Sequence, residues 1–263
     1  MSPAPSSNGP FQPGERILLQ EPDGHRTFLV ELIPGRTLHT HDGIVKHDAV
    51  IGERDGARIP THLGKSFVAA RPTLVQKMMK VKRKTQIIYP KEAARIALEL
   101  SIGPGCRVIE MGGGSGALTT LLATLVRPAG RVYSFDRNAD FQQVAMDNVA
   151  RVGLADAVEF SILEAGAPFG LPDVDAVVLD LPEPWLAIRP AFESLRLGGM
   201  FGSITPNVEQ LKQLHIEAEE AGFGGLYAME ILEREILVRR REGVRPSERM
   251  IGFTGYLLFG RKL

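Results

Sequence analysis

The stretch Arg107-Val-Ile-Glu-Met-Gly-Gly-Gly-Ser-Gly-Ala117 decides the fold of this chain. Its first four residues are typical of a buried β-strand, which runs into a series of glycines. A helical pattern follows over residues 116–126. Glycines allow a tight turn and let a ligand approach the backbone without a clash with a Cβ atom. The stretch therefore predicts a strand, a ligand-binding loop and a helix in succession.

The chain on both sides extends this unit into an α/β pattern. Helical periods at residues 93–100 and 139–152 alternate with strand-like runs, which lie at residues 107–110, 130–135, 158–163 and 175–180. Such alternation predicts βαβ units and a parallel sheet. Residues 228–239 and 250–260 look like two more strands, and their connection is too short for a crossover helix. We expect them to form an antiparallel pair that closes the sheet edge.

Residues 12–70 have a different character. Short apolar runs at residues 16–20, 27–32 and 49–51 are separated by Gly, Pro, Asp and His. Short apolar runs separated by turn-forming residues predict a small β-rich domain. We therefore expect two domains, residues 1–75 and 76–263, with residues 1–10 as a disordered tail.

Composition narrows the class of protein. No stretch approaches 18 apolar residues and the N-terminus has no apolar leader segment, so we expect neither a membrane span nor a signal peptide. The single cysteine, Cys106, excludes an internal disulfide framework and a Cys-based zinc site, and favours a reducing, intracellular location. The six histidines lack paired metal spacing, although His39 and His41 alternate as on a strand, so we expect no metal. Thirty-one basic and 31 acidic residues balance, so nucleic-acid binding would depend on local patches.

Two acidic residues accompany the glycine loop. Glu110 favours S-adenosylmethionine over NAD, because methyltransferases have an acidic residue there that orders the loop. Asp136 ends the next strand and can accept hydrogen bonds from the ribose hydroxyls of either cofactor. Gly112, Gly114 and Ala117 also satisfy the dinucleotide fingerprint. An NAD-dependent oxidoreductase, or a glycine turn that binds nothing, therefore stays an alternative.

The segment Asp180-Leu-Pro-Glu-Pro-Trp185 follows the last strand of the alternating pattern. Open α/β sheets bind ligands at the carboxyl ends of their strands. Asp180 can accept a hydrogen bond from an exocyclic amine, and Trp185 offers a flat face to a base. Many methyltransferases that act on amino groups have a shorter Asp/Asn-Pro-Pro-aromatic segment here. The alternatives are a loop-capping Asp180 and a core Trp185.

Basic residues gather in two places. Five of the eight residues from 77 to 84 are basic, which suits phosphate contacts, although a solvated charged face is the alternative. A second cluster, at residues 239–249, is diluted by Glu242 and Glu248. The basic residues that we expect to contact phosphate groups are Lys80, Lys82, Arg83, Lys84, Arg245 and Arg249.

Together these stretches resemble the tRNA (adenine-58-N1)-methyltransferase family of bacteria and archaea, which is related to the catalytic subunit of the eukaryotic enzyme. The most specific matches are Lys82-Arg-Lys-Thr-Gln-Ile-Ile-Tyr-Pro-Lys91 and Asp180-Leu-Pro-Glu-Pro-Trp185. Further matching stretches are Leu38–Gly43, His47–Gly52, Arg71–Leu74, Glu110–Thr119 and Met250–Tyr256. The resemblance therefore covers nearly the whole chain.

The resemblance implies a Rossmann-like class I methyltransferase domain with a small N-terminal β domain, in a cytoplasmic homotetramer. It implies methyl transfer from S-adenosylmethionine to N1 of adenine 58 in the T-loop of tRNA, and leaves open whether adenine 57 is modified. The implied catalytic residues are Asp180 and Tyr89, and Tyr89 or Trp185 could pack near the flipped base. The residues that we expect at the cofactor are Gln86, Glu110, Gly112, Gly114, Ser115, Gly116, Ala117, Asp136, Arg137, Glu164 and Asp180.

Some positions depart from the family pattern. Gly113 stands where threonine is usual, and Phe253 stands where histidine is common. Asp136 and Glu164 are more often Glu and Asp, and Glu248 also differs. Another S-adenosylmethionine-dependent RNA methyltransferase and a non-catalytic tRNA-binding subunit stay alternatives, but we expect the latter to lack the glycine loop and the aspartate.

Overall fold

The structure, a computed structural model, describes residues 9–22, 26–240 and 243–263. The chain divides into two compact units, residues 1–80 and 81–263. The predicted domain boundary, at residue 75, lies just before this division. Residues 1–8 of the predicted tail lie outside the described residues.

The first unit contains a four-stranded antiparallel sheet of order β2-β1-β6-β5 and a separate β3–β4 hairpin. Its elements are β1 (Arg16–Gln20), β2 (Thr27–Glu31), β3 (Thr37–Thr40), β4 (Gly43–Lys46), η1 (His47–Ala49), β5 (Arg58–Pro60), β6 (Ser66–Ala70) and α1 (Leu74–Met79). Phe11, Ile17, Leu19 and Phe67 lie in its fully buried core. The predicted β-rich character is confirmed, because alternate residues of these short strands face this core.

Two local expectations in this unit are wrong. The apolar run at residues 49–51 is not a strand: a 3-10 turn ends at Ala49, and Val50 is buried just after it. Strand β3 ends at Thr40, so His41 lies in the turn and does not share a strand with His39. The three apolar residues resemble a short strand in sequence, but only Val50 among them is buried, and it follows a turn.

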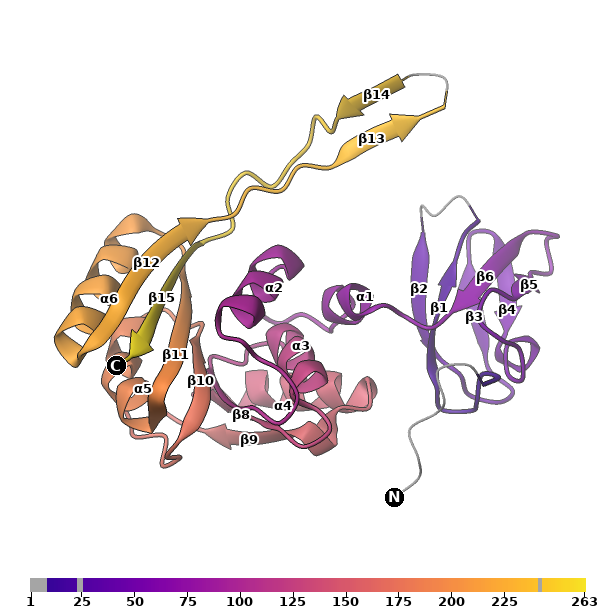
Figure 1. The fold of residues 1–263 in the computed structure, drawn as a ribbon. Coiled ribbons are helices and arrows are strands. Elements are labelled where there is room, and N and C mark those ends of the chain that lie inside the picture. Colours follow the sequence, from indigo (N-terminus) through magenta and orange to yellow (C-terminus); the bar gives the residue numbers. More distant parts are fainter. Residues whose placement is uncertain (1–8, 23–25, 241–242) are drawn as a thin grey trace. The chain divides into compact units, whose positions relative to one another are not determined.

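The second unit is built on a seven-stranded sheet of order β12-β15-β11-β10-β7-β8-β9 (Figure 1). Its strands are β7 (Arg107–Met111), β8 (Arg131–Asp136), β9 (Val158–Ile162), β10 (Val174–Leu179), β11 (Leu195–Thr205), β12 (Phe223–Glu230) and β15 (Tyr256–Lys262). Its helices are α2 (Pro90–Glu99), α3 (Ala117–Val126), α4 (Ala139–Arg151), η2 (Ala155–Ala157), η3 (Pro184–Ala187), α5 (Ile188–Ser194) and α6 (Val208–Ala221). Strands β9, β8, β7, β10 and β11 are parallel, which confirms the predicted parallel sheet.

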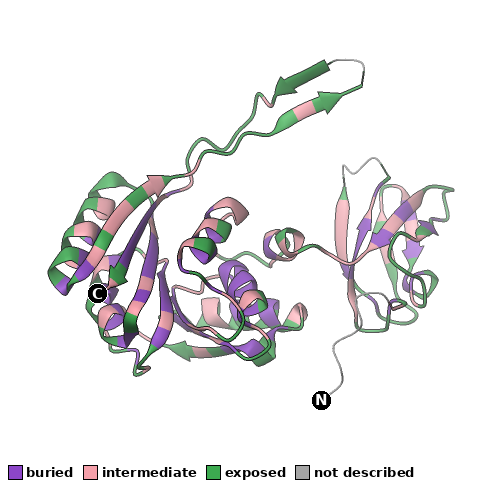
Figure 2. Ribbon diagram, in the orientation of Figure 1, coloured by how far each residue is buried: buried purple, intermediate pink, exposed green. Residues whose placement is uncertain are grey.

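Burial explains why these strands read as apolar runs. Ala176, Val177, Val178 and Leu179 of β10 are completely buried, because helices cover both faces of a parallel sheet. Figure 2 shows this burial along the central strands. The carboxyl ends of β7, β8 and β10 consequently meet at one edge, where the loops that follow them gather.

The C-terminal strands are partly as predicted. The antiparallel pair exists as β12 and β15, and β15 lies between β12 and β11. The predicted bounds are wrong, because β12 ends at Glu230 and β15 begins at Tyr256. Between them, β13 (Ile236–Arg239) and β14 (Gly243–Pro246) form a hairpin of their own, which projects from the sheet in Figure 1. The side chain of Val238 is 75% exposed, so this apolar segment does not belong to the core of the sheet.

No helix in the described ranges is long and apolar enough to cross a membrane.

Candidate active site

The glycine loop packs directly against the end of β10. Gly112 has a φ of +96°, and its amide donates a hydrogen bond to the carbonyl of Phe135 at 2.8 Å. The amide of Asp180 donates to the carbonyl of Met111 at 2.9 Å. A Cβ atom at Gly112 would overlap the carbonyl oxygen of Asp180. Glycine is therefore required here both by the left-handed backbone and by this close approach.

Glu110 lies buried beneath the loop. Its Oε2 accepts hydrogen bonds from the hydroxyls of Thr119 and Ser134, each at 2.7 Å, whereas its Oε1 has no partner. Burial, together with the charge of Asp136, raises the pKa of Glu110 above its usual value, although the two hydroxyls oppose this shift. Through these two hydroxyls Glu110 joins α3 to β8 beneath the loop, and its Oε1 is buried without a partner.

Ser134 also accounts for one departure from the family pattern. A Cβ atom at Gly113 would lie 2.5 Å from the Oγ of Ser134. A threonine at position 113 would require the hydroxyl of Ser134 to move, and so to give up its hydrogen bond to Glu110.

Asp136, at the end of β8, joins two segments of the site. Its Oδ2 accepts a hydrogen bond from the amide of Gly114 at 3.0 Å, and its Oδ1 accepts one from the amide of Asn138 at 2.9 Å. Asn138 in turn caps α4, because its Oδ1 accepts from the amide of Asp140 at 2.9 Å. Each carboxylate oxygen can accept a further hydrogen bond from a ligand.

A first cavity, of about 480 Å³, opens beside this loop. Six of the predicted cofactor residues line it, namely Gln86, Gly112, Gly114, Asp136, Arg137 and Asp180. The predicted residues Glu110, Ser115, Gly116, Ala117 and Glu164 are not among its lining residues. Glu164 is exposed, and its neighbour Ala165 lines the cavity instead. Sequence reasoning missed Asn138 and Phe141, which carry no motif, and Thr85, although Thr85 lies in the quoted segment 82–91.

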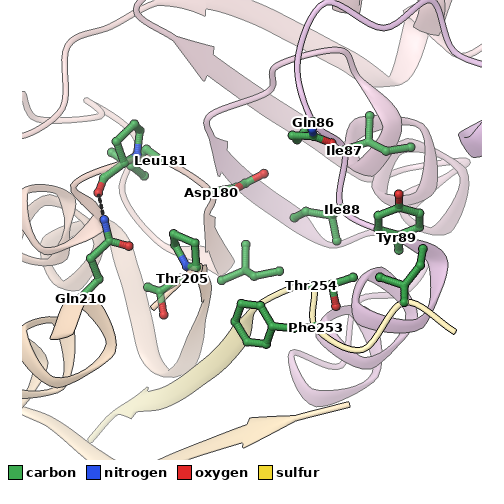
Figure 3. A pocket seen from close by; sticks show the side chains of 14 residues that line it. Gln86, Ile87, Ile88, Tyr89, Asp180, Leu181, Thr205, Gln210, Phe253 and Thr254 are labelled. Atoms are coloured by element: carbon green, nitrogen blue, oxygen red, sulfur yellow. Dashed lines mark hydrogen bonds between the residues drawn. The ribbon is translucent and has the colours of Figure 1, made fainter. Parts of the chain in front are cut away.

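A second cavity, of about 580 Å³, meets the first along shared walls. Gln86, Asp180, Leu181 and Pro182 line both cavities. The remaining walls of the second cavity are Ile87, Ile88, Tyr89, Ile204, Thr205, Pro206, Gln210, Ile251, Phe253 and Thr254 (Figure 3). The predicted Tyr89 therefore lies with Asp180 in this cavity, in walls that are mainly apolar. Phe253, at the second family departure, also lies here rather than on a remote surface.

Asp180 is the acidic side chain common to both cavities. Burial, together with the nearby carboxylates of Glu110 and Asp136, raises its pKa to about 7. Three carboxylates are thus gathered around one place. Such a cluster favours a cationic ligand, whose charge would return Asp180 to its ionised form.

Two polar residues, Asn148 and Ser115, hold the backbone of the basic segment at residues 82–85. Asn148 accepts a hydrogen bond from the amide of Lys82 at 3.0 Å and donates to the carbonyls of Lys82 and Ser115, each at 2.9 Å. The Oγ of Ser115 accepts from the amides of Lys84 and Thr85 at 3.0 and 3.1 Å. Ser115 therefore anchors the basic segment to the glycine loop, a role that its place in the motif did not reveal.

The expected RNA-contacting residues are dispersed. Lys82, Arg83 and Lys84 are exposed on the anchored segment, whereas Lys80 belongs to the first unit, where its Nζ donates to the carbonyl of Thr27 at 2.9 Å. Trp185 lies in η3, partly buried against the core, and lines neither cavity. Arg245, in β14, pairs with Glu248, and Arg249 is exposed. Residues 241 and 242 of the second basic cluster lie outside the described residues.

No cluster of three metal-ligating side chains occurs within the described ranges.

The fold and the site define the class of protein. In the sheet, the antiparallel strand β15 lies between the last of five neighbouring parallel strands, β11, and the edge strand β12. Together with the glycine loop after β7, this order is the architecture of Rossmann-like S-adenosylmethionine-dependent methyltransferases. The chain belongs to the family described as tRNA methyltransferase complex GCD14 subunit, whose model matches residues 67–245. A second model, described as TrmI-like N-terminal, matches residues 9–59.

Named relatives agree with this assignment. The tRNA (adenine(57)-N(1)/adenine(58)-N(1))-methyltransferase TrmI of Methanocaldococcus jannaschii is 33% identical over 79% of this chain and 82% of its own length. The crystal structure of a SAM-dependent O-methyltransferase from Thermotoga maritima matches with a TM-score of 0.90 and 34% identity, over 96% of this chain and 94% of the other. That of the tRNA (m1A58) methyltransferase TrmI from Aquifex aeolicus matches with a TM-score of 0.81 and 35% identity, over 97% and 99%. The resemblance and the fold class predicted from the sequence are confirmed.

Proposed function

We propose that this chain transfers a methyl group from S-adenosylmethionine to N1 of adenine 58 in the T-loop of tRNA. The observation that carries the proposal is the meeting of two cavities at Asp180 in a member of this family. One cavity would hold the methyl donor and the other the flipped adenine. A shared wall is what such a reaction requires, because donor and acceptor must lie in contact.

The first cavity suits S-adenosylmethionine. When bound, S-adenosylmethionine supplies a methyl group that is already activated on a sulfonium. Gly112 leaves room for close approach at the loop, and Asp136 would accept hydrogen bonds from the ribose hydroxyls. The carboxylates of Glu110, Asp136 and Asp180 would together favour the positive charge of the donor. Gln86, Arg137 and Glu164, with the loop residues Gly114 to Ala117, complete the proposed set.

Asp180 would orient the acceptor base in the second cavity. Its carboxylate would accept a hydrogen bond from the N6 amine of adenine, which leaves the lone pair of N1 directed toward the first cavity. The N1-methyladenine product is a cation, so an ionised Asp180 also stabilises the charge that develops during transfer. In folded tRNA this base must first leave its stack, as base-modifying enzymes generally require.

The apolar walls would then hold the flipped base. Tyr89 caps the start of α2 and lines the cavity opposite the Asp180 loop, and Phe253 lines it from the return segment before β15. Aromatic rings at these positions can pack against a purine. Phe253 therefore replaces the common histidine with another flat side chain, and we expect the chemistry to be unaffected.

RNA contacts and assembly belong to the same proposal. Lys80, Lys82, Arg83, Lys84, Trp185, Arg245 and Arg249 would contact tRNA in the cytoplasm. We propose a homotetramer, which would let one tRNA meet basic patches of several subunits and offset the zero net charge. The exposed apolar side chains Ile236, Val238 and Val244 of the β13–β14 hairpin support self-association. Sedimentation of the purified chain should give four subunits, and a monomer at micromolar concentration would contradict this part.

Mass spectrometry of nucleosides tests the reaction itself. Unmodified tRNA incubated with the chain and S-adenosylmethionine should yield N1-methyladenosine at position 58, and the same digest reports whether position 57 is modified. Methylation of an oxygen atom instead of N1 would favour the O-methyl transfer named for the Thermotoga maritima relative. Binding of tRNA without any methyl incorporation would favour a non-catalytic subunit. Thermal protection by NAD and not by S-adenosylhomocysteine would favour an oxidoreductase.

A further inference from the structure

A buried charged cluster lies beside the second cavity and has no role in the function proposed above. Its members are Lys91 and Glu92, in the first turn of α2, and Thr254, just before β15. The side chains of Lys91 and Glu92 are 11% and 1% exposed. Lys91 and Thr254 also lie in two of the stretches that carry the family resemblance, although 163 positions separate them along the chain.

The ammonium of Lys91 uses its donors on three different partners. It pairs with the carboxylate of Glu92, and it donates hydrogen bonds to the carbonyl of Ile231 and to the Oγ1 of Thr254, each at 2.7 Å. The hydroxyl of Thr254 donates in turn to Oε1 of Glu92. Oε2 of Glu92 has no partner. A buried lysine and glutamate are costly to desolvate, so the cluster needs this complete set of bonds around the ammonium.

These bonds tie together three segments of the second unit. Ile231 directly follows β12, and Thr254 directly precedes the Gly255 that leads into β15. They are the two ends of the excursion that carries the β13–β14 hairpin. Lys91 therefore joins both ends of this excursion to the first turn of α2, immediately after Tyr89.

The same contacts determine where one wall of the second cavity lies. Ile251, Phe253 and Thr254 line this cavity from the excursion, and Tyr89 lines it from the start of α2 (Figure 3). The described residues 250–255 form no strand or helix, so hydrogen bonds of a regular element do not hold them. We infer that Lys91 is a positioning residue, which with Glu92 holds segment 251–254 against α2 and so shapes the cavity for the acceptor base. The inference rests on the proposed function, because it takes the second cavity as the acceptor site.

The first cavity contains no member of the cluster. Loss of the cluster should therefore weaken productive binding of the acceptor and leave binding of the methyl donor unchanged. This separation distinguishes a positioning role from a general contribution to folding, which would affect both ligands.

The test compares two variants of the full chain with a matched control. Lys91→Met leaves Glu92 buried without its oppositely charged partner and should lower the melting temperature. The double variant Lys91→Met/Glu92→Met removes both charges and should recover stability, because apolar side chains of similar size often replace a buried pair without loss. Arg95→Met is the control, since it removes an ion pair with Glu99 on the same helix, away from both cavities.

For the double variant we expect kcat/KM toward tRNA to fall by about 10- to 100-fold, the loss typical of a misplaced binding wall. The dissociation constant for S-adenosylmethionine should stay within about twofold of wild type, and limited proteolysis at residues 249–254 should accelerate. A stable double variant with wild-type kcat/KM would overturn the inference, as would an equal loss of donor affinity. If the wild-type chain methylates no tRNA, the proposed function fails, and unchanged proteolysis at residues 249–254 in the double variant would separately refute the positioning role of Lys91.

Discussion

Replacing Asp180 with asparagine should stabilise the chain and inactivate it, and the gain in stability should depend on pH. Burial and two neighbouring carboxylates raise the pKa of Asp180 to about 7, from an ordinary value near 3.8. Between these two pH values the unfolded chain loses the proton of Asp180 while the folded chain keeps it. The free energy of unfolding of the wild type therefore falls as the pH rises from about 4 to 7. Asparagine keeps the shape of the side chain and does not titrate there.

The size of the effect follows from the shift. About three pKa units, at roughly 1.4 kcal/mol each, set a ceiling of about 4 kcal/mol. Asp180 is partly exposed in its cavities, so water screens some of this cost, and we expect about 2 kcal/mol. The difference between Asp180→Asn and wild type should be smallest near pH 4, grow up to pH 7 and stay level above it. Turnover should fall on the order of 10²- to 10³-fold, as for the loss of one preorganised polar group.

Urea unfolding at pH 4.5, 6, 7 and 8, at one protein concentration and without S-adenosylmethionine, measures this profile. Asp175→Asn is the matched control, because Asp175 lies at the start of β10 and Asp180 directly follows its end. Burial alone would raise the pKa of Asp175, but hydrogen bonds from the Arg107 amide and the Arg196 side chain lower it. That variant should lose stability at neutral pH, and the loss should shrink as the pH falls through the carboxyl range. A pH-independent difference for Asp180→Asn would refute the assigned environment of Asp180.

Three further outcomes test the site. Asp136→Ala should weaken S-adenosylmethionine binding by roughly 1.5–3 kcal/mol, the range for a hydrogen bond to a charged group, and calorimetry with an unchanged dissociation constant would remove it from the cofactor site. Neutralising the four predicted basic residues at positions 80–84 should weaken tRNA binding and reduce the log–log salt slope by about 0.7–0.9 per lost phosphate contact; an unaltered slope would identify a merely solvated face. Gly113→Thr should lower the melting temperature and donor affinity because its Cβ meets Ser134, and Gly113→Thr/Ser134→Ala should recover both. Equal defects in the single and double variants would show that Ser134 is not the obstacle.

Local signals were sufficient for much of the fold. The strand, glycine loop and helix of residues 107–126 were predicted almost to the residue, because an apolar run, a left-handed turn and a helical period are each encoded by neighbouring positions. The meeting of Asp136 and Asp180 near the loop followed from a topological rule, since carboxyl ends of adjacent parallel strands share one edge. These inferences needed no knowledge of distant contacts.

Other features depend on packing between segments that are remote in sequence. An exposed valine in β13 and a buried one in β10 have the same side chain, so the hairpin could not be distinguished from the sheet. Glu110 stands beside the loop in sequence, yet the strand directs it beneath the loop, away from the lining of the first cavity. Side-chain direction in such a case is decided by the neighbouring strands and helix.

The sequence by itself determined the class of fold, the glycine loop and the acids at the strand ends. The tertiary structure alone decided how residues far apart complete the site. Asn148 and Ser115 hold the backbone of the basic segment. Lys91 contacts Thr254, which lies 163 positions further along the chain. The physical reason is that a hydrogen bond between distant segments depends on the docking of whole helices and strands, which no local pattern of residues encodes.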